Sequence, residues 1–314
     1  MKTLLPLAIT GGDGAGIGPE IAARACAVFP EETFHLFTHQ ALFERACKSA
    51  GVPIPSNIVW HNIPLSVPTE DIQPGTNQVA TGELAYQSVV AATQATLQGE
   101  MRAIITAPFS KAALHLAGHA NVPGHTELIA RLCGREEATM AFFGPQMVLS
   151  LATIHIALRD VPQWLTRERL LRVFKDTAEA LSRRLDRRPK IGVLALNPHA
   201  GENGAFGDEE ARVILPAINE AQEWADFIGP LVPDTALIPS NGATNYDGFV
   251  AMYHDQGLIP FKLSAFDQGV NVTLGLPVLR TSPDHGTAFN LAWKGVASAT
   301  SMIAAIRCAQ ELTQ

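Results

Sequence analysis

The chain has 314 residues, of which 47% are hydrophobic and 17% charged, with 25 glycines and 21 prolines. This length and composition exclude a disordered chain, a fibrous repeat and a mini-protein, and they allow two ordinary domains or one large α/β domain. Lysine and arginine total 23 against 30 aspartate and glutamate, a formal net charge of -7. The chain therefore lacks the general excess of positive charge that a nucleic-acid partner requires.

The first ten residues, MKTLLPLAIT, resemble the start of a signal peptide. Their apolar stretch is short, however, contains Pro6 and runs into Gly11 without a small-residue cleavage site. We therefore expect a buried first strand at this position. No uninterrupted apolar stretch reaches the roughly 18 residues needed to cross a bilayer, so we expect a soluble protein with no membrane partner.

The cysteines indicate the redox compartment. They are widely scattered, form no CxxC pair and mostly lie in apolar helical patterns. The four are Cys26, Cys47, Cys133 and Cys308. This usage is typical of free thiols in a reducing environment, and a cytoplasmic location is expected.

Short β-type runs alternate with longer helical patterns along the chain, which predicts an α/β fold with a mostly parallel sheet and helices on both faces. Strands are expected over residues 4–10, 34–37, 103–106, 139–143, 148–153, 191–196, 249–253, 270–274 and 278–280. Helices are expected over residues 19–28, 40–50, 82–98, 111–116, 126–133, 167–185, 209–224 and 297–312. The longest should be 167–185. Residues 63–78 carry three prolines and are expected to form a surface connection. No linker marks a domain boundary.

A glycine-rich segment, GGDGAGIGPE at residues 11–20, lies between the first predicted strand and helix. Backbone N–H groups and a helix dipole at such a position can face an anion. The glycines lack the GxGxxG spacing of the dinucleotide fingerprint, and no GK[ST] follows for a P-loop. Two interpretations stay open: a loop that lines an active-site cleft, or a tight turn that needs small residues.

Polar residues follow the predicted strand 103–106 directly, in TAPFSK and then GHTE. Ligands of open α/β sheets bind at the carboxyl ends of strands, so His125 and Thr126 could hold a small anionic substrate. Thr126 could also cap the helix that begins there, with Glu127 in its first turn.

Three histidines, His155, His199 and His254, fall at the ends of predicted strands. Three imidazoles with an open fourth position describe a catalytic site for Zn²⁺ or a similar borderline metal, and not the all-oxygen shell that Mg²⁺ prefers. A lone histidine at such a place is more often a hydrogen-bonded core or loop residue. No two of the three share a short metal motif, so the spacing is only suggestive.

Lys262, Asn271 and Arg280 are expected on or beside successive late strands. Cations are costly in an apolar sheet unless they meet an anion, so a phosphate or carboxylate pocket would explain them, with Arg280 as a bidentate fork and Lys262 as a point charge. Pairing with Asp267 or Asp284 is the structural alternative.

The segment DHGT at residues 284–287 is expected to open a helix and could contact substrate or cofactor through its backbone N–H groups. The candidate cofactor-binding residues are Gly275, Asp284, His285 and Gly286.

Seven motifs in this order, GDGAGIGPE, TAPFSK, GHTE, LNPHAGENGAFGDEE, AMYHDQGLIPFK, GVNVTLGLP and RTSPDHGTAF, resemble the 4-hydroxythreonine-4-phosphate dehydrogenase family of vitamin B6 biosynthesis. The resemblance spans nearly the whole chain. It implies the fold of isocitrate and isopropylmalate dehydrogenases, with two α/β domains that share a cleft: residues 1–125 with 275–314, and a dimer-forming domain at 126–274. The familiar first motif has proline where this chain has Gly14, a departure that loosens a turn and removes no chemical group.

The resemblance also implies residue roles. His155, His199 and His254 would bind a divalent metal (zinc, cobalt or magnesium), the first two from one chain and His254 from the partner of a homodimer with shared active sites. The substrate-binding set would be His125, Thr126, Lys262, Asn271 and Arg280. Asp255 and Asp234 are candidates for accepting the hydroxyl proton or for orienting a histidine.

The implied reaction is the metal-dependent oxidation of 4-phosphooxy-L-threonine by NAD or NADP, with decarboxylation to 3-amino-2-oxopropyl phosphate, in pyridoxine 5'-phosphate biosynthesis. Relatives with the same motifs oxidise threonate or erythronate 4-phosphate, or a cis-dihydrodiol of terephthalate, so the substrate within the family stays open. A metal-dependent phosphohydrolase and a non-catalytic sensor of phosphorylated acids are the alternatives from other classes.

Overall fold

The computed structural model describes residues 4–238, 244–265 and 267–314, and the chain divides into two compact units. Unit 1 comprises Met1–Ala138 and Leu276–Gln314, and unit 2 comprises Thr139–Gly275. Residues 126–138, which the sequence groups with the second domain, belong to unit 1. Helix α5 (His125–Leu132) explains this, because it packs against α3 (Val79–Leu97) of the same unit.

Unit 1 is built on a parallel sheet with the strand order β3-β2-β1-β4-β11. Its strands are β1 (Leu7–Thr10), β2 (Phe34–Thr38), β3 (Ile58–Asn62), β4 (Ala103–Thr106) and β11 (Arg280–Pro283). In the centre of the sheet, Ile9 lies opposite Leu36 on one side and Ile105 on the other. Every residue of β1 and β4 is buried, as expected for parallel strands that helices cover on both faces.

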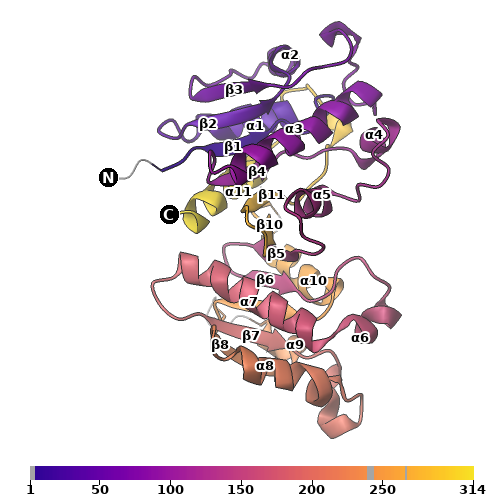
Figure 1. Cartoon of the computed structure of the whole chain (residues 1–314), viewed down its shortest axis with the longest axis vertical. Helices are drawn as coiled ribbons and strands as arrows, with labels where there is room; N and C mark the ends of the chain where they lie inside the picture. The colour runs from indigo at the N-terminus through magenta and orange to yellow at the C-terminus, as the bar shows by residue number, and fades with distance from the viewer. Residues whose placement is uncertain (1–3, 239–243, 266) are drawn as a thin grey trace. The chain divides into compact units, whose positions relative to one another are not determined.

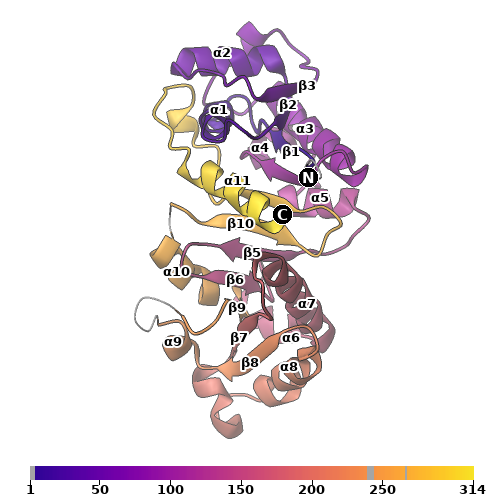
Figure 2. The same ribbon diagram turned by 90° about the vertical axis from the view of Figure 1, so that its left-hand side faces the viewer.

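The helices of unit 1 form two layers on its sheet (Figure 2). One layer contains α1 (Gly18–Ala27), α2 (Gln40–Ala50) and α11 (Thr300–Leu312), and the other contains α3 with α4 (Lys111–Leu116) and α5. Two short 3-10 turns, η1 (Thr69–Asp71) and η5 (Phe289–Leu291), lie in the loops. The core under α3 includes Ile104, Leu114 and Ile129, all fully buried.

Unit 2 has the strand order β10-β5-β6-β9-β7-β8. Its strands are β5 (Thr139–Phe143), β6 (Val148–Leu151), β7 (Lys190–Leu194), β8 (Asp226–Leu231), β9 (Gly248–Ala251) and β10 (Val270–Leu274). Strand β5 runs antiparallel to both β10 and β6, and the remaining pairs are parallel. Because Thr139 lies opposite Leu274, the first and last strands of this unit are neighbours.

Helices cover both faces of the unit 2 sheet (Figures 1 and 2). One face carries α7 (Arg167–Arg184) and α8 (Leu215–Ala221), and the other carries α9 (Pro233–Ala236) and α10 (His254–Ala265). The remaining elements are α6 (Val161–Trp164), the 3-10 turns η2 (Leu158–Asp160) and η3 (Pro198–Gly204), and a π-helical turn, η4 (Glu210–Ile214). Phe249, Phe261 and Leu149 are fully buried in the core between sheet and α10.

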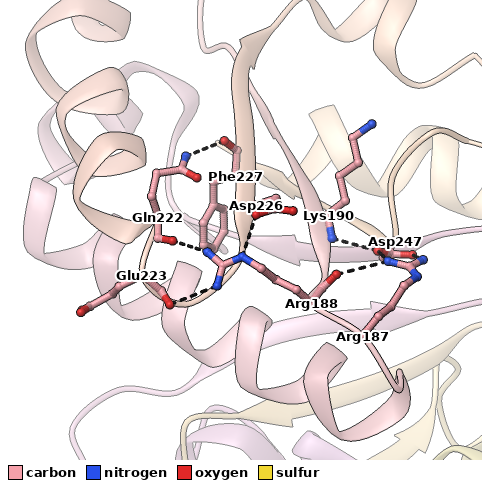
Figure 3. Close-up of polar contacts among 8 residues, drawn as sticks. All are labelled: Arg187, Arg188, Lys190, Gln222, Glu223, Asp226, Phe227 and Asp247. Carbon is pink, nitrogen blue, oxygen red and sulfur yellow. Dashed lines mark hydrogen bonds and ion pairs between the residues drawn. The ribbon is translucent and has the colours of Figure 1, made fainter.

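A polar network holds the starts of β7 and β8 and the approach to β9 (Figure 3). Arg187 donates two hydrogen bonds to Asp247, at 2.7 and 2.5 Å, and the N–H of Lys190 donates to the same carboxylate at 2.8 Å. Arg188 donates to Asp226 at 2.6 Å and to carbonyls after α8. Burial alone would raise the pKa of Asp247, but Arg187 and the Lys190 N–H outweigh it and lower that pKa.

The structure confirms the predicted α/β class and most of the predicted elements, and it corrects others. The longest helix is α3, with 19 residues, because α7 has 18. The helix expected over 209–224 begins with a π-helical turn and ends at Ala221. No helix opens at residues 284–287, because only the short turn η5 precedes α11. The sequence missed β3, β8, α10 and the short helices α6 and α9.

The location of Lys262 is the correction with the most bearing on function. The residue is expected on or beside a late strand, but it lies exposed on α10.

Among the described helices, none is both long and apolar enough to span a membrane. All four cysteines are free, as predicted.

Candidate active site

The glycine-rich loop after β1 is a buried turn. Residues 11–20 are all buried, and the N–H groups of Asp13, Gly16 and Ile17 donate to backbone carbonyls at 2.9 to 3.1 Å. Gly12 has φ +68°, and a Cβ there would collide with the carbonyl oxygen of Pro108. These amides are therefore used inside the protein, and the structure favours the tight-turn interpretation over an anion-binding loop.

Asp13 is a buried acidic residue inside this turn. Its side chain is fully buried and accepts a hydrogen bond from the N–H of Ala15 at 3.0 Å. Burial raises the pKa of Asp13 to about 6, although hydrogen bonds with Ala15, Thr81 and Ser110 oppose the rise. The backbone N–H of Asp13 donates to Pro108, so this residue joins the turn to the segment that follows β4.

The segment after β4 and the start of α5 bring together residues from the substrate set. The imidazole of His125 stacks on the ring of Phe109, with centroids 3.6 Å apart and planes at 18°. Arg280, at the start of β11, is 4% exposed, and its Nε and Nη2 donate to the Thr106 hydroxyl at 3.0 and 2.8 Å. Thr126 is also buried, but it lies inside the first turn of α5 and is not the predicted helix cap, because the N-cap residue is Gly124.

Burial has opposite consequences for the two ionisable groups of this cluster. Burial lowers the pKa of Arg280 to about 10, against the attraction of Glu127, so the guanidinium remains charged at neutral pH. Burial, followed by the charges of Arg280 and Lys111, lowers the pKa of His125 well below its usual range. The Nε2 atom of this neutral imidazole is buried without a hydrogen-bond partner among the described residues. A buried cation beside an unmatched ring nitrogen is suited to an anionic ligand.

In unit 2, the structure places the other two substrate candidates differently. Asn271 lies on β10, as predicted, and its Oδ1 atom is buried without a hydrogen-bond partner among the described residues. Lys262 lies on the exposed side of α10. Asn271 thus has an acceptor atom that a ligand can use. The exposed side chain of Lys262 offers no such evidence of ligand binding.

His155 and His254 lie close together in unit 2. Strands β6 and β9 are parallel neighbours, and the hydroxyl of Thr153 donates to the carbonyl of Met252 at 2.7 Å, so the segments after both strands are held together. The two imidazole centroids are 5.8 Å apart, with planes at 42°. Nδ1 of His254 and Oδ1 of Asp255 are 2.7 Å apart.

These two histidines line one cavity of about 510 Å³. Its other lining residues are Thr153, Ile154, Ile156, Leu158, Val161, Tyr253 and Asp255. The cavity is therefore mostly apolar, with two imidazoles and a carboxylate.

The start of α10 is fixed by Gln256, which accepts from the N–H of Met252 at 2.7 Å and donates to the carbonyl of Ala195 at 2.6 Å.

His199 lies in a different setting, on the exposed turn η3 after β7. Its ring faces that of Phe206, with centroids 6.3 Å apart. His155 and His199 both have positive φ angles, 22° and 52°, which residues other than glycine adopt at functional sites when surrounding contacts enforce them. Among the described residues of one chain, no three histidine, cysteine or acidic side chains are grouped to hold a metal.

The remaining candidates are dispersed. Asp234 lies exposed on α9. Gly275 follows β10 with φ +77°, where a Cβ would collide with the carboxylate of Asp176. In the loop after β11, Asp284 is half-buried, and His285 and Gly286 are exposed. Sequence reasoning missed Phe109, Asp13 and Glu210, although each lies within a motif that it singled out.

The donor chemistry of this site fits a divalent metal in part. Imidazoles suit Zn²⁺ or Co²⁺ better than Mg²⁺, and a carboxylate that holds the second ring nitrogen, as Asp255 does for His254, is common at metal-binding histidines. One chain, however, brings only two of the three histidines together.

Comparison with known proteins gives consistent results. The model of the family described as "Pyridoxal phosphate biosynthetic protein PdxA" matches residues 22–309. A 4-hydroxythreonine-4-phosphate dehydrogenase from Geobacter metallireducens is 46% identical, over 98% of this chain and 95% of its own. A D-threonate 4-phosphate dehydrogenase from Salmonella typhimurium is 41% identical, over 98% of both chains.

The comparison with solved structures points to the same enzyme as the sequence relatives. The crystal structure of 4-hydroxythreonine-4-phosphate dehydrogenase from Klebsiella pneumoniae aligns with a TM-score of 0.87 and 38% identity, over 99% of this chain and 100% of that one. At the level of fold alone, an isocitrate dehydrogenase from Methylococcus capsulatus aligns with a TM-score of 0.50 and 16% identity, over 98% and 86%. The chain therefore belongs to the family of the pyridoxal phosphate biosynthetic protein PdxA.

Proposed function

We propose that this protein is an NAD(P)-dependent dehydrogenase that oxidises the hydroxyl of 4-phosphooxy-L-threonine and releases 3-amino-2-oxopropyl phosphate and CO₂, in the biosynthesis of pyridoxine 5'-phosphate. The observation that carries the proposal is the full-length similarity, at 46% identity, to a 4-hydroxythreonine-4-phosphate dehydrogenase. The buried anion-binding cluster in unit 1 supports it, because this substrate carries a phosphate and a carboxylate.

In this proposal, Arg280, His125 and Thr126 bind an anionic group of the substrate. A buried guanidinium forms strong charge-assisted hydrogen bonds, and a neutral His125 can turn its unmatched Nε2 toward the ligand without adding a second buried charge. Asn271 would accept, at its buried Oδ1, a hydrogen bond from the amino group or a hydroxyl group of the substrate. Lys262 remains in the proposed set on the strength of the family alone.

His155, His254 and His199 would hold the divalent metal. When bound, such a metal acts as a Lewis acid that lowers the pKa of the substrate hydroxyl and stabilises the charge left by the departing CO₂. The close pair of His155 and His254 favours placing these two ligands in one chain. We therefore propose that a homodimer shares its sites and that His199 comes from the partner, a division different from the one the resemblance implies.

The protein's own acidic groups would position and accept protons. Asp255 holds Nδ1 of His254, so Nε2 of that ring is left to face the cavity. Either Asp255 or Asp234 would take the hydroxyl proton while the carbon that bore the hydroxyl gives its hydride to the nicotinamide.

The nicotinamide cofactor, NAD or NADP, would be bound outside the glycine-rich turn, because the N–H groups of Asp13, Gly16 and Ile17 there already donate to backbone carbonyls. We propose that Gly275 and the segment 284–286 contribute instead, because the exposed backbone after β11 can offer N–H groups. NAD is favoured by the family. We also expect the protein in the cytoplasm, where its four free cysteines would stay reduced.

A second substrate has a specific observation behind it. The D-threonate 4-phosphate dehydrogenase is 41% identical over the same span, little below the 46% of the first relative. Oxidation of D-threonate 4-phosphate would use the same phosphate-binding groups and the same hydride transfer.

The test is a panel of phosphorylated hydroxy acids with NAD⁺ or NADP⁺ and Zn²⁺ or Co²⁺, followed by the absorbance of the reduced nicotinamide. We expect the highest kcat/KM with 4-phosphooxy-L-threonine. Higher kcat/KM with D-threonate 4-phosphate would move the protein to that branch. Phosphate release without nicotinamide reduction would indicate a phosphohydrolase, and binding without turnover a sensor.

A further inference from the structure

The turn that carries His199 has an unusual backbone. Residues 199 to 203 are consecutive and all have positive φ angles: His199 52°, Ala200 54°, Gly201 79°, Glu202 41° and Asn203 56°. Only one of the five is glycine, the residue that adopts such angles without steric cost. A left-handed run of this length persists only where other contacts enforce it.

The contacts that enforce it converge on one carboxylate. Glu210 is 6% exposed, at the first residue of the π-helical turn η4. Its Oε1 accepts from the N–H groups of Leu196 and Asn197, at 2.9 and 2.7 Å, and its Oε2 accepts from the Asn197 side chain at 3.0 Å. Oε1 therefore binds both residues that lead into the turn, and Oε2 binds Asn197, whose side chain also donates to Glu209 at 2.7 Å.

The glycines of the turn show how closely it is held against Glu210. A Cβ on Gly201 would lie 2.9 Å from Oε2 of Glu210, and a Cβ on Gly207 would lie 2.5 Å from Nδ2 of Asn197. The N–H of Phe206 closes the turn by donating to the carbonyl of Gly201 at 3.2 Å. Single-turn π-helical segments such as η4 often occur at functional sites, and this one places the carboxylate under the turn.

We propose that Glu210 is a positioning residue that fixes the left-handed turn and thereby holds His199 in the orientation for binding the metal. The inference rests on the proposed function, because it takes His199 as a metal ligand. Glu210 contacts neither the metal nor the substrate in this role. It acts through the backbone of residues 196 and 197.

A carboxylate is the side chain that this position requires. Glutamine at 210 would keep one acceptor for the two backbone N–H groups but would turn an NH₂ group toward Nδ2 of Asn197, placing two donors face to face. Alanine would leave the N–H groups of Leu196 and Asn197 without their acceptor, whereas the Asn197 side chain would keep its bond to Glu209 at 2.7 Å. The two variants should therefore differ in degree, with Glu210→Ala the more severe.

The first measurement uses metal-free protein and amide hydrogen exchange. In Glu210→Ala, exchange at residues 196–203 should quicken at least about tenfold, while the core strands keep wild-type protection. Asp208→Asn is the matched control, because Asp208 is an exposed carboxylate of the same segment, bonded to Arg212 at 3.3 Å. Unchanged exchange in Glu210→Ala and Glu210→Gln would overturn the proposed anchoring.

The second measurement is the Kd for Co²⁺, followed by its visible absorption. We expect Glu210→Ala to raise this Kd roughly 10- to 100-fold, the usual loss for residues that orient a metal ligand, and Glu210→Gln to raise it less. In a His199→Ala background, Glu210→Ala should change the Kd no further. A further rise in that background would show that Glu210 acts by another route.

The outcomes separate the two proposals. If the wild-type protein binds no Co²⁺, the proposed metal site fails, and with it the role of Glu210 toward the metal, while hydrogen exchange still reports on the anchoring. If the wild type binds Co²⁺ and both Glu210 variants bind it equally well, only this inference fails. A melting curve shows whether Glu210→Ala folds, and the milder Glu210→Gln provides the test if it does not.

Discussion

Arg280 shows how one buried charge can prepare a binding site. Its guanidinium lies in unit 1 against the hydroxyl of Thr106, beside the neutral ring of His125. Burial makes a cation at such a place unfavourable, and the attraction of Glu127 offsets the effect of burial on its pKa only in part. Under the proposed function, binding of the anionic substrate would offset this cost.

Replacing Arg280 by alanine should weaken binding of a phosphorylated substrate by about 2–4 kcal/mol, because a charge-assisted pair is lost and the anion is left partly unpaired. Arg280→Lys should recover only part of the loss, since lysine lacks the planar fork. Substrate Kd from calorimetry is the measurement, and Arg307→Ala on the exposed side of α11 is the control. Equal affinity in Arg280→Ala would show that the substrate binds elsewhere.

Asp13 should give the fold an unusual pH dependence. Because its pKa is raised to about 6 from 3.8, the folded state binds this proton more tightly than the unfolded state. Its contribution to stability is therefore greatest at low pH and falls as the pH rises from 3.8 through 6. At 1.36 kcal/mol per pKa unit, the loss is on the order of 2–3 kcal/mol.

The measurement is urea unfolding of wild type and Asp13→Asn between pH 4.5 and 7.5. Relative to the variant, the wild type should lose stability as the pH rises. The half-buried pair His35 and His61 titrates in both proteins and in the opposite sense, because burial lowers both pKa values, so it cancels in the comparison. Parallel pH profiles would contradict the assignment to Asp13.

At the scale of elements, the contact between α3 and α4 depends on a missing side chain. A Cβ on Gly82 would collide with the backbone carbonyl of Ala113, so this glycine lets the two helices approach. Alanine favours a helix by about 1 kcal/mol over glycine, yet overpacking against rigid backbone costs about 1–3 kcal/mol or more. We expect the collision to outweigh the propensity.

Gly82→Ala should therefore lower the melting temperature, with Gly286→Ala as the matched control, since a Cβ at Gly286 meets nothing within 4 Å and needs no special backbone angle. The expected loss is roughly 2–8 °C. A raised melting temperature in Gly82→Ala would show that α3 and α4 can separate slightly and that the higher helix propensity of alanine outweighs the collision.

The elements that the sequence could not predict share a physical cause. Helix α10 contains Gly257 and Pro260, which argue against a helix, but Leu258 and Phe261 pack into the core under β6 and β9 and outweigh the local preference. This error also led to the expectation that Lys262 lies on or beside a late strand. Strand β8 was not predicted because it contains a glycine and a proline. Strand β3 was not predicted because its residues are only half-buried at a sheet edge.

The candidate site was predictable in its residue types and not in its grouping. A histidine after a strand is visible in sequence, but the pairing of His155 with His254 follows from β6 and β9 being neighbours, which depends on strand order. The role of Glu210 depends on a turn whose φ angles no composition rule reveals. The family resemblance alone grouped the three histidines as metal ligands, and the Co²⁺-binding measurement tests that grouping.

At the scale of the whole molecule, mixing of inactive variants tests the proposed dimer. With His155 and His254 in one chain, His155→Ala and His254→Ala should not complement each other, because every mixed site lacks a ligand. With His199 from the partner, His155→Ala and His199→Ala leave one site of two intact in each mixed dimer. Random reassortment should then restore about a quarter of wild-type activity under two-fold symmetry.

Each of the other outcomes of the mixing experiment would indicate a different division of the three ligands between the two chains. Recovery with the pair His155→Ala and His254→Ala, and not with His155→Ala and His199→Ala, would restore the division that the resemblance implies. No recovery with either pair would place all three ligands in one chain. An active monomer on size-exclusion chromatography would exclude shared sites altogether.

The neighbouring ends of unit 2 have a consequence for biosynthesis on the ribosome. Unit 2 is a continuous segment, Thr139–Gly275, whose first and last strands pair with each other, so it can close while the rest of the chain is still being translated. Unit 1 begins first and finishes last, because β4 gains its partner β11, and β11 its covering helix α11, only from the final residues. A nascent chain that stalls before residue 280 would thus expose the unpaired edge of β4 after unit 2 has folded, and we expect chaperones to bind at that edge.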